Sequence, residues 1–423
     1  MKLTNYFRNT MNTLQQLMTV LSVALLAACT PKEKPFRTAL EMRDAVKVGW
    51  NLGNSLEAFD DQSSGLDTEL AWFNPRTTKV MIDSVKAAGF NAIRVPIRWE
   101  PHFQMEEGKL VVDPAWMSRV QEVVDWCMED DLITIINTHH DHWLESHPFY
   151  ADSTEVLDKE RQLWTLISDH FKEYDDRLLF AGTNEVHLMG QWGPASDEQG
   201  DMQNVFNQTF VNTVRATGGN NRNRNLIVQT YYCAPVHNAK LFVAPKDVVE
   251  NHLMIDIHLY EPSTYAMLGI ERYWGAEYLD DIKKDEIHVP ERQMVGPDQI
   301  RAYLDGKFNN PETDEQRMDK LLEGVKVSLD QWGLPLVLSE CGASRWCELD
   351  APAQDRVLLS RAYYSEYLIR AARRCGMAPF LWDNGSLGIG TEHFGLFDRN
   401  DNMKPDRQTI DGIMRGAEEP YGE

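Results

Sequence analysis

Short apolar runs alternate with amphipathic stretches along this chain of 423 residues, and the alternation predicts its architecture. The eight runs are Val48–Asn54, Ala92–Ile97, Ile133–His140, Leu178–Glu185, Leu226–Thr230, Met254–Tyr260, Pro335–Glu340 and Pro379–Asn384. Parallel strands that are buried on both faces have continuous apolar sequences, and each crossover between them needs a helix. Eight such strands close most simply into a (β/α)8 TIM barrel, an α/β fold, with a doubly wound sheet as the alternative.

The segments between the runs carry helical signals. The segment Met318–Trp332 spaces its apolar residues as one buried helical face does. The pairs Asn74-Pro75 and Asp113-Pro114 each place a capping residue before a proline, which predicts that a helix begins at each pair. Residues 261–334 are more than one crossover requires, so we expect extended loops or a small insertion there.

The N-terminal 28 residues have the pattern of a secretory signal, with two cations, no acid and the apolar run Met18–Ala28. The following segment, Leu26-Ala27-Ala28-Cys29, resembles the lipobox of bacterial lipoproteins, in which the cysteine is acylated. We therefore expect a signal peptide at 1–28, a lipidated Cys29 with a tether at 29–42, and a folded domain at 43–423. The acyl chains would anchor the protein to a membrane of the bacterial cell envelope, which we expect to be the outer membrane, facing the periplasm or the cell surface. Ordinary cleavage beside an incidental cysteine is the alternative.

The charge of the chain restricts its partners. Lys and Arg total 42 against 65 Asp and Glu, which gives a formal net charge of -23. A surface this acidic repels phosphate backbones, so we expect no nucleic acid partner. Apart from Cys29, five of the six cysteines remain, an odd number that requires at least one free thiol. Because no CxxC pair occurs, neither a zinc site nor a disulfide-rich scaffold is indicated.

Polar residues collect where the predicted strands end. In a barrel, the side chains that act on a substrate belong at the C-terminal ends of the strands. The residues found there are Arg94, His139, His140, Asn184, Glu185, His258, Tyr260, Glu340, Trp382 and Asp383. Two carboxyl groups among such neighbours form the set needed to break a glycosidic bond, provided that one is protonated and the other ionised.

The run His139-His140-Asp141-His142 also offers residue types that bind metals. Consecutive side chains of an extended chain point to opposite faces, which separates His139 from His140. No second group of ligands follows at a recognised spacing. We therefore expect no metal and no cofactor.

Taken together, the motifs resemble those of glycoside hydrolase family 5, the cellulase family, over nearly the whole chain after the signal. They are Gly49-Trp50-Asn51-Leu52-Gly53-Asn54, Gly89-Phe90-Asn91-Ala92-Ile93-Arg94-Val95-Pro96, Asn137-Thr138-His139-His140-Asp141, Gly182-Thr183-Asn184-Glu185, Ile257-His258-Leu259-Tyr260, Leu338-Ser339-Glu340 and Leu381-Trp382-Asp383-Asn384. Each motif alone is weak, but their joint order, one per strand end, is specific. One departure is Val186, where members of the family usually have proline after the glutamate.

The resemblance implies a retaining β-glycanase in which Glu185 is the acid/base and Glu340 the nucleophile. Residue chemistry agrees, because Arg94 and the hydroxyl of Tyr260 would favour an ionised Glu340. Glu185, facing that negative charge, would keep its proton.

The other strand-end residues would bind the sugar. Asn184 would contact the 2-hydroxyl, Trp382 would offer a flat apolar face, and His140 would contact a neighbouring sugar or stand at the entrance. The remaining substrate-binding residues would be Arg94, His139, His258 and Tyr260.

The expected activity is endo-acting hydrolysis of a neutral β-1,4-linked plant polysaccharide, of the cellulose, β-glucan or xyloglucan type, by a monomer. The motif Gly49–Asn54 and the segment Asn74–Lys79 favour the endo-β-1,4-glucanase and xyloglucanase subgroup. A β-mannanase of the same family is one alternative. The other is a surface glycan-binding lipoprotein that has kept the fold and lost turnover.

Overall fold

The computed structural model describes residues 35–422, except 192, 286–295, 349–351 and 353–354. The chain divides into two units, Met1–Phe36 and Arg37–Glu423, and the fold described below belongs to the second. The predicted signal peptide and Cys29 lie outside the described residues. Among the helices that are described, none combines the length and the apolar character needed to cross a membrane.

Eight parallel strands close into a barrel in the order β1-β10-β9-β8-β7-β6-β5-β2. Their bounds are β1 Gly49–Asn51, β2 Ala92–Val95, β5 Ile133–Asn137, β6 Leu178–Ala181, β7 Leu226–Gln229, β8 Leu253–Leu259, β9 Leu336–Cys341 and β10 Met377–Leu381. Each predicted apolar run overlaps one of these strands, so the predicted (β/α)8 barrel is confirmed. Two small antiparallel pairs lie outside the barrel: β3 Phe103–Glu106 with β4 Lys109–Val112, and β11 Phe397–Asp398 with β12 Lys404–Pro405.

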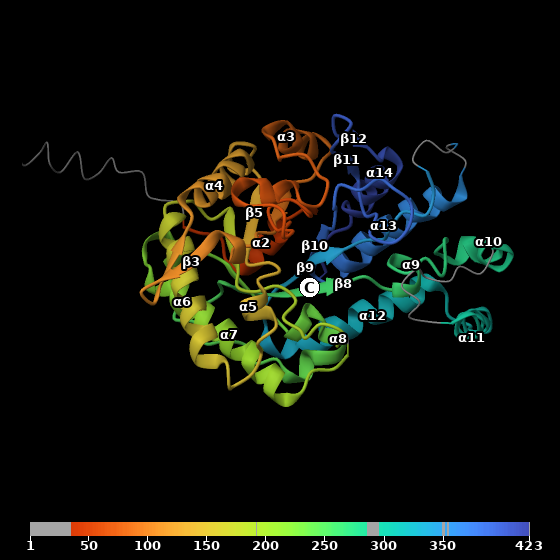
Figure 1. Ribbon diagram of the computed structural model, residues 1–423. Helices are drawn as coiled ribbons and strands as arrows, with labels where there is room; N and C mark the ends of the chain where they lie inside the picture. Colours follow the sequence, from red (N-terminus) through yellow and green to blue (C-terminus); the bar gives the residue numbers. More distant parts are fainter. Residues whose placement is uncertain (1–34, 192, 286–295, 349–351, 353–354, 423) are drawn as a thin grey trace, which may run out of the picture. The chain divides into compact units, whose positions relative to one another are not determined.

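Helices surround the barrel strands, as Figure 1 shows. Their bounds are α2 Ala39–Ala45, α3 Lys79–Ala87, α4 Pro114–Glu129, α5 His142–Glu145, α6 Ser153–His170, α7 Asp197–Ala216, α8 Pro235–Asn238, α9 Ser263–Ala266, α10 Leu279–Lys284, α11 Pro297–Phe308, α12 Asp314–Leu329, α13 Arg356–Arg374 and α14 Arg407–Gly416. Helices α9 to α12 all lie between β8 and β9, within the stretch of residues 261–334.

The helix signals have mixed outcomes. Asp113 caps α4 as predicted, since its carboxylate accepts a hydrogen bond from the backbone of Ala115. The helix start predicted at Asn74-Pro75 is wrong, because α3 begins at Lys79. The amide of Asn74 instead donates to the backbone carbonyls of Asn54 and Asn384. The same residue type that caps a helix also bridges loops, and the sequence does not distinguish the two uses.

Helix α12 shows the predicted buried face. Its residues Met318, Leu322, Val325 and Leu329 are all buried. The helix ends at Leu329, however, and Trp332 lies in a short 3-10 turn, Asp330–Trp332, where it is only half-buried.

The barrel interior is apolar at its N-terminal end. A cluster of Ile135, Leu179, Ile227, Met254, Val337 and Phe380 from six strands packs with Ala39, Met42 and Val46, from α2 and its C-cap. Side chains alternate across a strand, so the residues two positions further along point to the same interior. In β5, β7, β8 and β9 those residues are Asn137, Gln229, Asp256 and Ser339. In β2, Arg94 follows Ala92 of the same cluster by two positions, and Trp382 takes the equivalent place directly after β10. The interior therefore changes from apolar to polar toward the C-terminal ends of the strands.

Candidate active site

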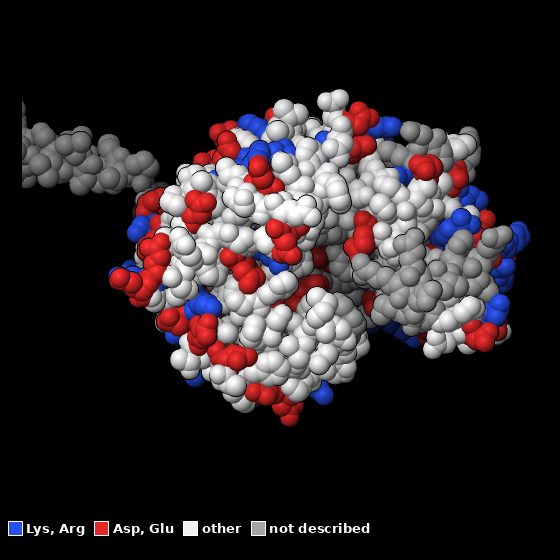
Figure 2. All heavy atoms as spheres, viewed as in Figure 1, with Lys and Arg blue, Asp and Glu red and all other residues white. Residues whose placement is uncertain are grey.

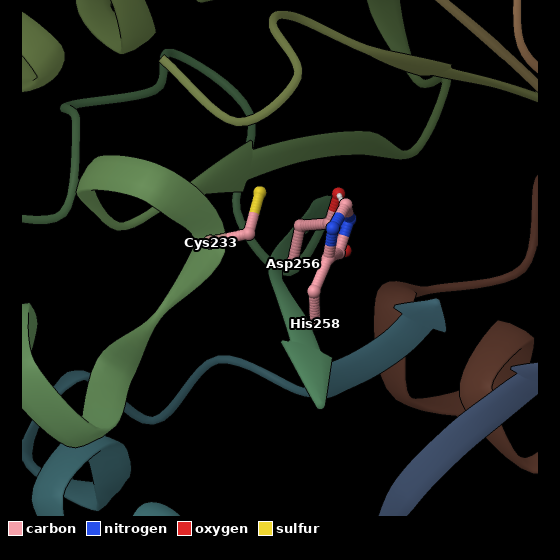
Figure 3. Close-up of side chains that lie close together, drawn as sticks. All are labelled: Cys233, Asp256 and His258. Carbon is pink, nitrogen blue, oxygen red and sulfur yellow. Dashed lines mark ion pairs between the residues drawn. The ribbon is translucent and has the colours of Figure 1, made fainter. Parts of the chain in front are cut away.

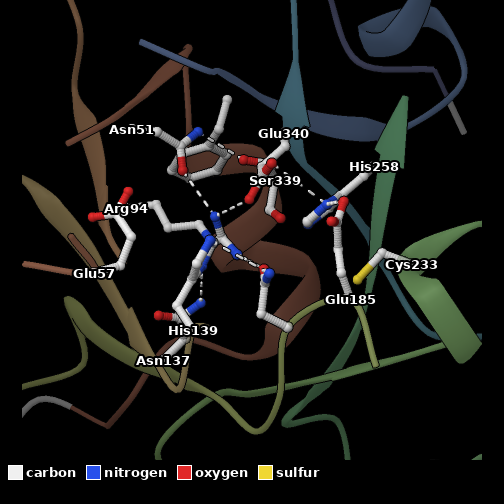
Figure 4. Close-up of polar contacts among 12 residues, drawn as sticks. Asn51, Glu57, Arg94, Asn137, His139, Glu185, Cys233, His258, Ser339 and Glu340 are labelled. Carbon is white, nitrogen blue, oxygen red and sulfur yellow. Dashed lines mark hydrogen bonds and ion pairs between the residues drawn. The ribbon is translucent and has the colours of Figure 1, made fainter. Parts of the chain in front are cut away.

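Glu340 reaches the barrel interior through an irregularity in β9. Along the β8–β9 ladder, Ile257 pairs with Leu338, and the next residue, His258, pairs with Glu340. The extra residue in β9 is Ser339, so the alternation of side chains shifts by one position at this point. Such bulges next to active sites re-aim a side chain. Here the shift brings Glu340 to the side of the strand that faces the other polar residues (Figure 4).

Glu185 lies beyond the end of β6. Its φ of 41° is in the left-handed region, which is uncommon for a residue other than glycine and is found at functional sites. Val186 follows and is fully buried in the core. Glu185 comes close to Glu340, because one carboxylate oxygen of each, together with a nitrogen of His258, lies within a mutual distance of 4.8 Å.

The two carboxyl groups differ in exposure. The side chain of Glu185 is 25% exposed, and that of Glu340 is only 7% exposed. In the space-filling view the surface is hollowed near its centre, and acidic side chains are visible inside the hollow (Figure 2).

Arg94 connects the two halves of the site. Its guanidinium donates to Glu340 Oε1 at 2.7 Å, to Asn184 Oδ1 at 2.7 Å and to Asn51 Oδ1 at 3.0 Å. Arg94 is completely buried. Its hydrogen bonds therefore hold Glu340 and Asn184 in position. Because Asn184 Oδ1 accepts from Arg94, the amide nitrogen of Asn184 faces His139 Nε2 at 3.4 Å.

Glu340 is surrounded by donors and positive charge. The hydroxyl of Tyr260 donates to Oε2 at 3.0 Å, and His258 Nδ1 lies 3.5 Å from the same oxygen. Burial by itself would raise the pKa of Glu340. The charges of His258 and Arg94 and the hydrogen bonds from Arg94 and Tyr260 outweigh it, so the pKa lies below its usual value. Glu340 is therefore ionised at neutral pH.

His258 connects the two glutamates. Its Nδ1 donates to Glu185 Oε1 at 2.7 Å, while Nε2 lies 3.9 Å from Asp256 Oδ2 on the same strand. Burial lowers the pKa of His258, but the neighbouring groups of Cys233, Glu340 and Glu185 raise it well above its ordinary value. The ring is therefore an imidazolium that faces both carboxyl groups.

Two aromatic rings form another part of the site. The rings of His139 and Trp382 are stacked, with centroids 5.9 Å apart and an angle of 8° between their planes. Gly53 permits this arrangement, since a Cβ atom there would lie 2.7 Å from the Trp382 ring. Burial, followed by the positive charges around it, lowers the pKa of His139 well below its ordinary value, so this ring is neutral.

The ring of His140 meets that of His139 edge-on, with centroids 4.4 Å apart, so the predicted separation of the two side chains is wrong. The side chain of His140 is 38% exposed. Its ring meets Trp72 edge-on at 5.9 Å, and its backbone N–H donates to Glu145 Oε1 at 2.7 Å. Its φ of 59° is also left-handed, which turns the chain at the end of β5. His140 thus lies at the rim of the site.

The structure brings the predicted site residues together at the C-terminal ends of the strands. Sequence reasoning assigned no role to Asn51, Cys233 or Asp256, which also lie there. Asn51 was within a recognised motif, and Asp256 precedes His258 by two positions on the same face of β8, so both carried a signal. The position of Cys233 depends on a left-handed turn after β7, at φ 59° for Tyr232 and 48° for Cys233, which the sequence did not indicate.

Two groups of side chains have the spacing of metal ligands among the described residues, and both contain His258. One is Glu185, His258 and Glu340; the other is Cys233, Asp256 and His258 (Figure 3). A metal requires a deprotonated histidine and thiolate. The neighbouring groups of Cys233, Glu340 and Glu185 raise the pKa of His258, and burial raises the pKa of Cys233 to about 12. Neither group therefore offers a ready ligand set at neutral pH.

A parallel barrel that holds two facing glutamates at the C-terminal ends of its strands has the arrangement that glycoside hydrolases use. The comparison with known proteins agrees. The profile of the family described as Cellulase (glycosyl hydrolase family 5) matches residues 53–388. The chain belongs to glycoside hydrolase family 5.

Characterised relatives cover most of the chain. Endoglucanase B of Clostridium cellulovorans is 31% identical over 90% of this chain and 76% of that protein. The xyloglucan-specific endo-β-1,4-glucanase of Bacteroides ovatus is 31% identical over 90% of this chain and 70% of that protein. The solved structure of a broad specificity endoglucanase from Ruminococcus champanellensis with bound cellotriose has a TM-score of 0.74 and 30% identity, and covers 90% of this chain and 100% of that one.

Proposed function

We propose that this glycoside hydrolase is an endo-β-1,4-glucanase that retains anomeric configuration, with Glu340 as nucleophile and Glu185 as acid/base. The observation that carries the proposal is the approach of the two carboxyl groups, with one oxygen of each within 4.8 Å of the other. Retaining enzymes place their carboxyl groups about 5 to 5.5 Å apart, whereas inverting enzymes need about 6.5 Å or more to admit a water molecule.

In the first step, an oxygen of Glu340 attacks the anomeric carbon and forms a covalent glycosyl–enzyme bond. The glycosidic C–O bond breaks, and Glu185 gives its proton to the leaving oxygen. The lowered pKa of Glu340 supports its role as the ionised partner. His258 donates to Glu185 Oε1, which leaves the other oxygen of Glu185 to carry the proton.

In the second step, Glu185 takes a proton from water, and the water oxygen attacks the anomeric carbon. The bond to Glu340 breaks, and the carboxylate returns to its hydrogen bonds with Arg94 and Tyr260. Asn184 faces the site with its amide nitrogen and would donate to the 2-hydroxyl, a contact that strengthens in the transition state.

A glucan backbone is the favoured substrate. Support comes from the relatives, which are named as endoglucanases and as a xyloglucan-specific endoglucanase. The acidic chain, at -23, favours a neutral polysaccharide over an anionic one. Mannan differs only in an axial 2-hydroxyl, so it is the closest alternative.

The test is to incubate the purified protein with β-glucan, xyloglucan and mannan and to measure new reducing ends. We expect release from the glucans, at internal bonds, so that viscosity falls before small products accumulate. Binding to these polysaccharides without any new reducing ends would instead identify a glycan-binding protein that has lost turnover.

We further propose that the protein is a monomer anchored by acylation of Cys29 to a membrane of the bacterial cell envelope. The apolar run before Leu26-Ala27-Ala28-Cys29 supports this proposal. Radiolabelled fatty acid should enter the unaltered protein and not the Cys29→Ala variant when both are expressed in bacteria. Equal labelling of the two would contradict the acylation of Cys29.

A further inference from the structure

Arg98 lies just beyond the end of β2 and is buried, with only 6% of its surface exposed. Its Nε is shut off from solvent and has no hydrogen-bond partner. Within the described residues, its guanidinium forms no ion pair, and it lies over the ring of Phe59 at 5.1 Å from the ring centre. Arginine has five N–H donors, and a buried one normally has most of them bonded.

An unpaired guanidinium is costly to bury, because it loses water and gains no acceptor in exchange. The contact with Phe59 compensates only in part, since a cation over an aromatic ring is worth less than the lost hydrogen bonds. The buried arginines Arg94 and Arg399 also have an Nε without a partner, but their terminal nitrogens have acceptors within the protein: Arg94 bonds Glu340, and Arg399 bonds Asp383. The terminal nitrogens of Arg98, in contrast, have no acceptor among the described residues, and a ligand in the cavity that Arg98 lines would supply one.

Arg98 lines a cavity of about 580 Å³ together with Phe59, Asp60, Asp61, Glu100 and His142. This size lies within the range of small-molecule pockets, about 300 to 1,000 Å³. The lining residues follow β1, β2 and β5, which are neighbours in the barrel. The cavity therefore opens at the same end of the barrel as the glutamate pair.

The cavity is also electrostatically connected to the site. Burial first, and then the positive charge of Arg98, lowers the pKa of His140. His142, which lines the cavity, follows His140 by two positions. The cavity is thus lined by neither Glu185 nor Glu340, and it lies next to the rim of the site at His140.

The charges in the cavity determine which ligand fits. Hydrogen bonds from Ser63 and Gln62 lower the pKa of Asp60, which is therefore ionised. Asp61 is exposed, and Glu100 accepts a hydrogen bond from the backbone of His142. One cation among three carboxyl groups disfavours an anionic ligand. A neutral sugar fits these groups better. Its hydroxyls donate to carboxylates and accept from a guanidinium, and the apolar face of its ring packs against an aromatic side chain.

We propose that this cavity is a subsite for a neutral sugar residue of the substrate away from the bond that is cleaved, and that Arg98 is its main donor. The inference rests on the proposed glycanase function. It assigns to Arg98 the preference of the enzyme for longer or branched chains. Arg98 contacts a non-reacting sugar, so its contribution belongs to binding and not to the bond-breaking steps.

The experiment measures oligosaccharide binding by calorimetry with the full-length protein carrying Glu340→Gln, which prevents turnover. We compare this parent with Arg98→Met in the same background, using cellohexaose and cellobiose as probes. Arg98→Met should weaken cellohexaose binding roughly 10-fold or more, since it removes hydrogen bonds from a charged donor. Cellobiose, which is too short to fill the whole cleft, should lose less. Arg301→Met is the control, because Arg301 on α11 is 60% exposed.

A second variant protects the test against a folding defect. Asp61→Asn changes an exposed carboxylate, so it should leave the thermal unfolding temperature unchanged and weaken cellohexaose binding several-fold. Equal cellohexaose affinity for the parent, Arg98→Met and Asp61→Asn would overturn the inference.

The sugar class is tested with a xylo-oligosaccharide that carries a glucuronic acid branch. The neutral assignment would be overturned if this acidic probe bound more tightly than a neutral xylo-oligosaccharide of equal length and if Arg98→Met removed that difference in affinity. Such a result would show a subsite for an acidic sugar. Failure of the proposed function has a different signature: with Glu340 intact, no new reducing ends would form from any glycan, whatever residue occupies position 98.

Discussion

At the scale of single residues, the site depends on the different surroundings of two chemically similar side chains. Glu340 accepts hydrogen bonds from Arg94 and Tyr260 and is nearly buried. Glu185 is more exposed, and its carboxylate is bonded by His258 Nδ1. The nucleophile must be a carboxylate that is held in place, whereas the acid/base must exchange a proton with substrate and water. The asymmetry of the two environments therefore matches the division of roles.

Two substitutions separate these roles. Glu340→Gln should lower turnover of every substrate by roughly 10,000-fold or more, the scale seen when a nucleophile is removed. Glu185→Ala should still form the glycosyl–enzyme from aryl glycosides with good leaving groups, which need no proton. Azide should then restore turnover and yield a β-glycosyl azide, detectable by NMR. Azide rescue of Glu340→Gln with the same β product would contradict the assignment.

The acid limb of the pH profile should respond to Tyr260. The pKa of Glu340 is lowered in part by the Tyr260 hydroxyl, so Tyr260→Phe should raise that pKa. Because activity needs ionised Glu340, the acid limb of kcat/KM should move to higher pH, and kcat/KM at its optimum should fall roughly 10- to 100-fold. The stability that Glu340 contributes is present above its unfolded-state pKa and is lost as the pH falls through its lower folded-state pKa. An acid limb at the same pH in both proteins would contradict this account.

At the scale of elements, the bulge in β9 positions the nucleophile, and Asn51 on β1 holds the bulge. The amide of Asn51 donates to the carbonyl of Ser339 at 2.8 Å and to that of Leu381 at 3.1 Å. Its oxygen accepts from Arg94. One side chain therefore ties β1 to β9 and β10 and also orients the arginine.

Asn51→Ala should consequently affect stability and activity together. It leaves two buried carbonyls and one buried guanidinium N–H without partners, which should cost about 2 to 5 kcal/mol of unfolding free energy. It should also lower kcat more than it raises KM, since Glu340 and Asn184 lose a common support. Urea denaturation and steady-state kinetics measure the two effects. Loss of stability with unchanged kcat would show that Asn51 supports the fold alone.

The sequence predicted the elements better than the local geometry. Each apolar run overlapped a strand because the barrel strands are buried on both faces, and this burial is visible in composition. The shift at Ser339 and the left-handed turn at Cys233 were not predicted, because both arise from tertiary packing that no local pattern records. Asn74 was predicted as a helix cap and instead bridges two loops. The glutamate pair was predictable because strand ends meet at one end of a barrel, whereas the unpaired state of Arg98 required the contacts themselves.

At the scale of the whole molecule, the barrel separates stability from chemistry along its axis. Its N-terminal end is filled by apolar side chains, including Met42 of α2, which is completely buried. Its C-terminal end holds the polar network and the carboxyl pair. In barrels of this kind, the N-terminal end of the strands maintains stability, whereas changes at the C-terminal end allow different reactions.

This separation predicts the behaviour of Met42→Ala. The substitution leaves a cavity at the end of the barrel away from Glu185 and Glu340, and it should cost about 2 to 5 kcal/mol of unfolding free energy. Below the unfolding transition, kcat and KM on β-glucan should stay within about two-fold of the unaltered enzyme, because distant sites without shared partners act independently. Differential scanning calorimetry and initial rates measure the two quantities. A large fall in kcat at a temperature where the variant is fully folded would contradict this separation. It would show that a change of packing at the N-terminal end affects the carboxyl pair and that the two ends form one cooperative unit.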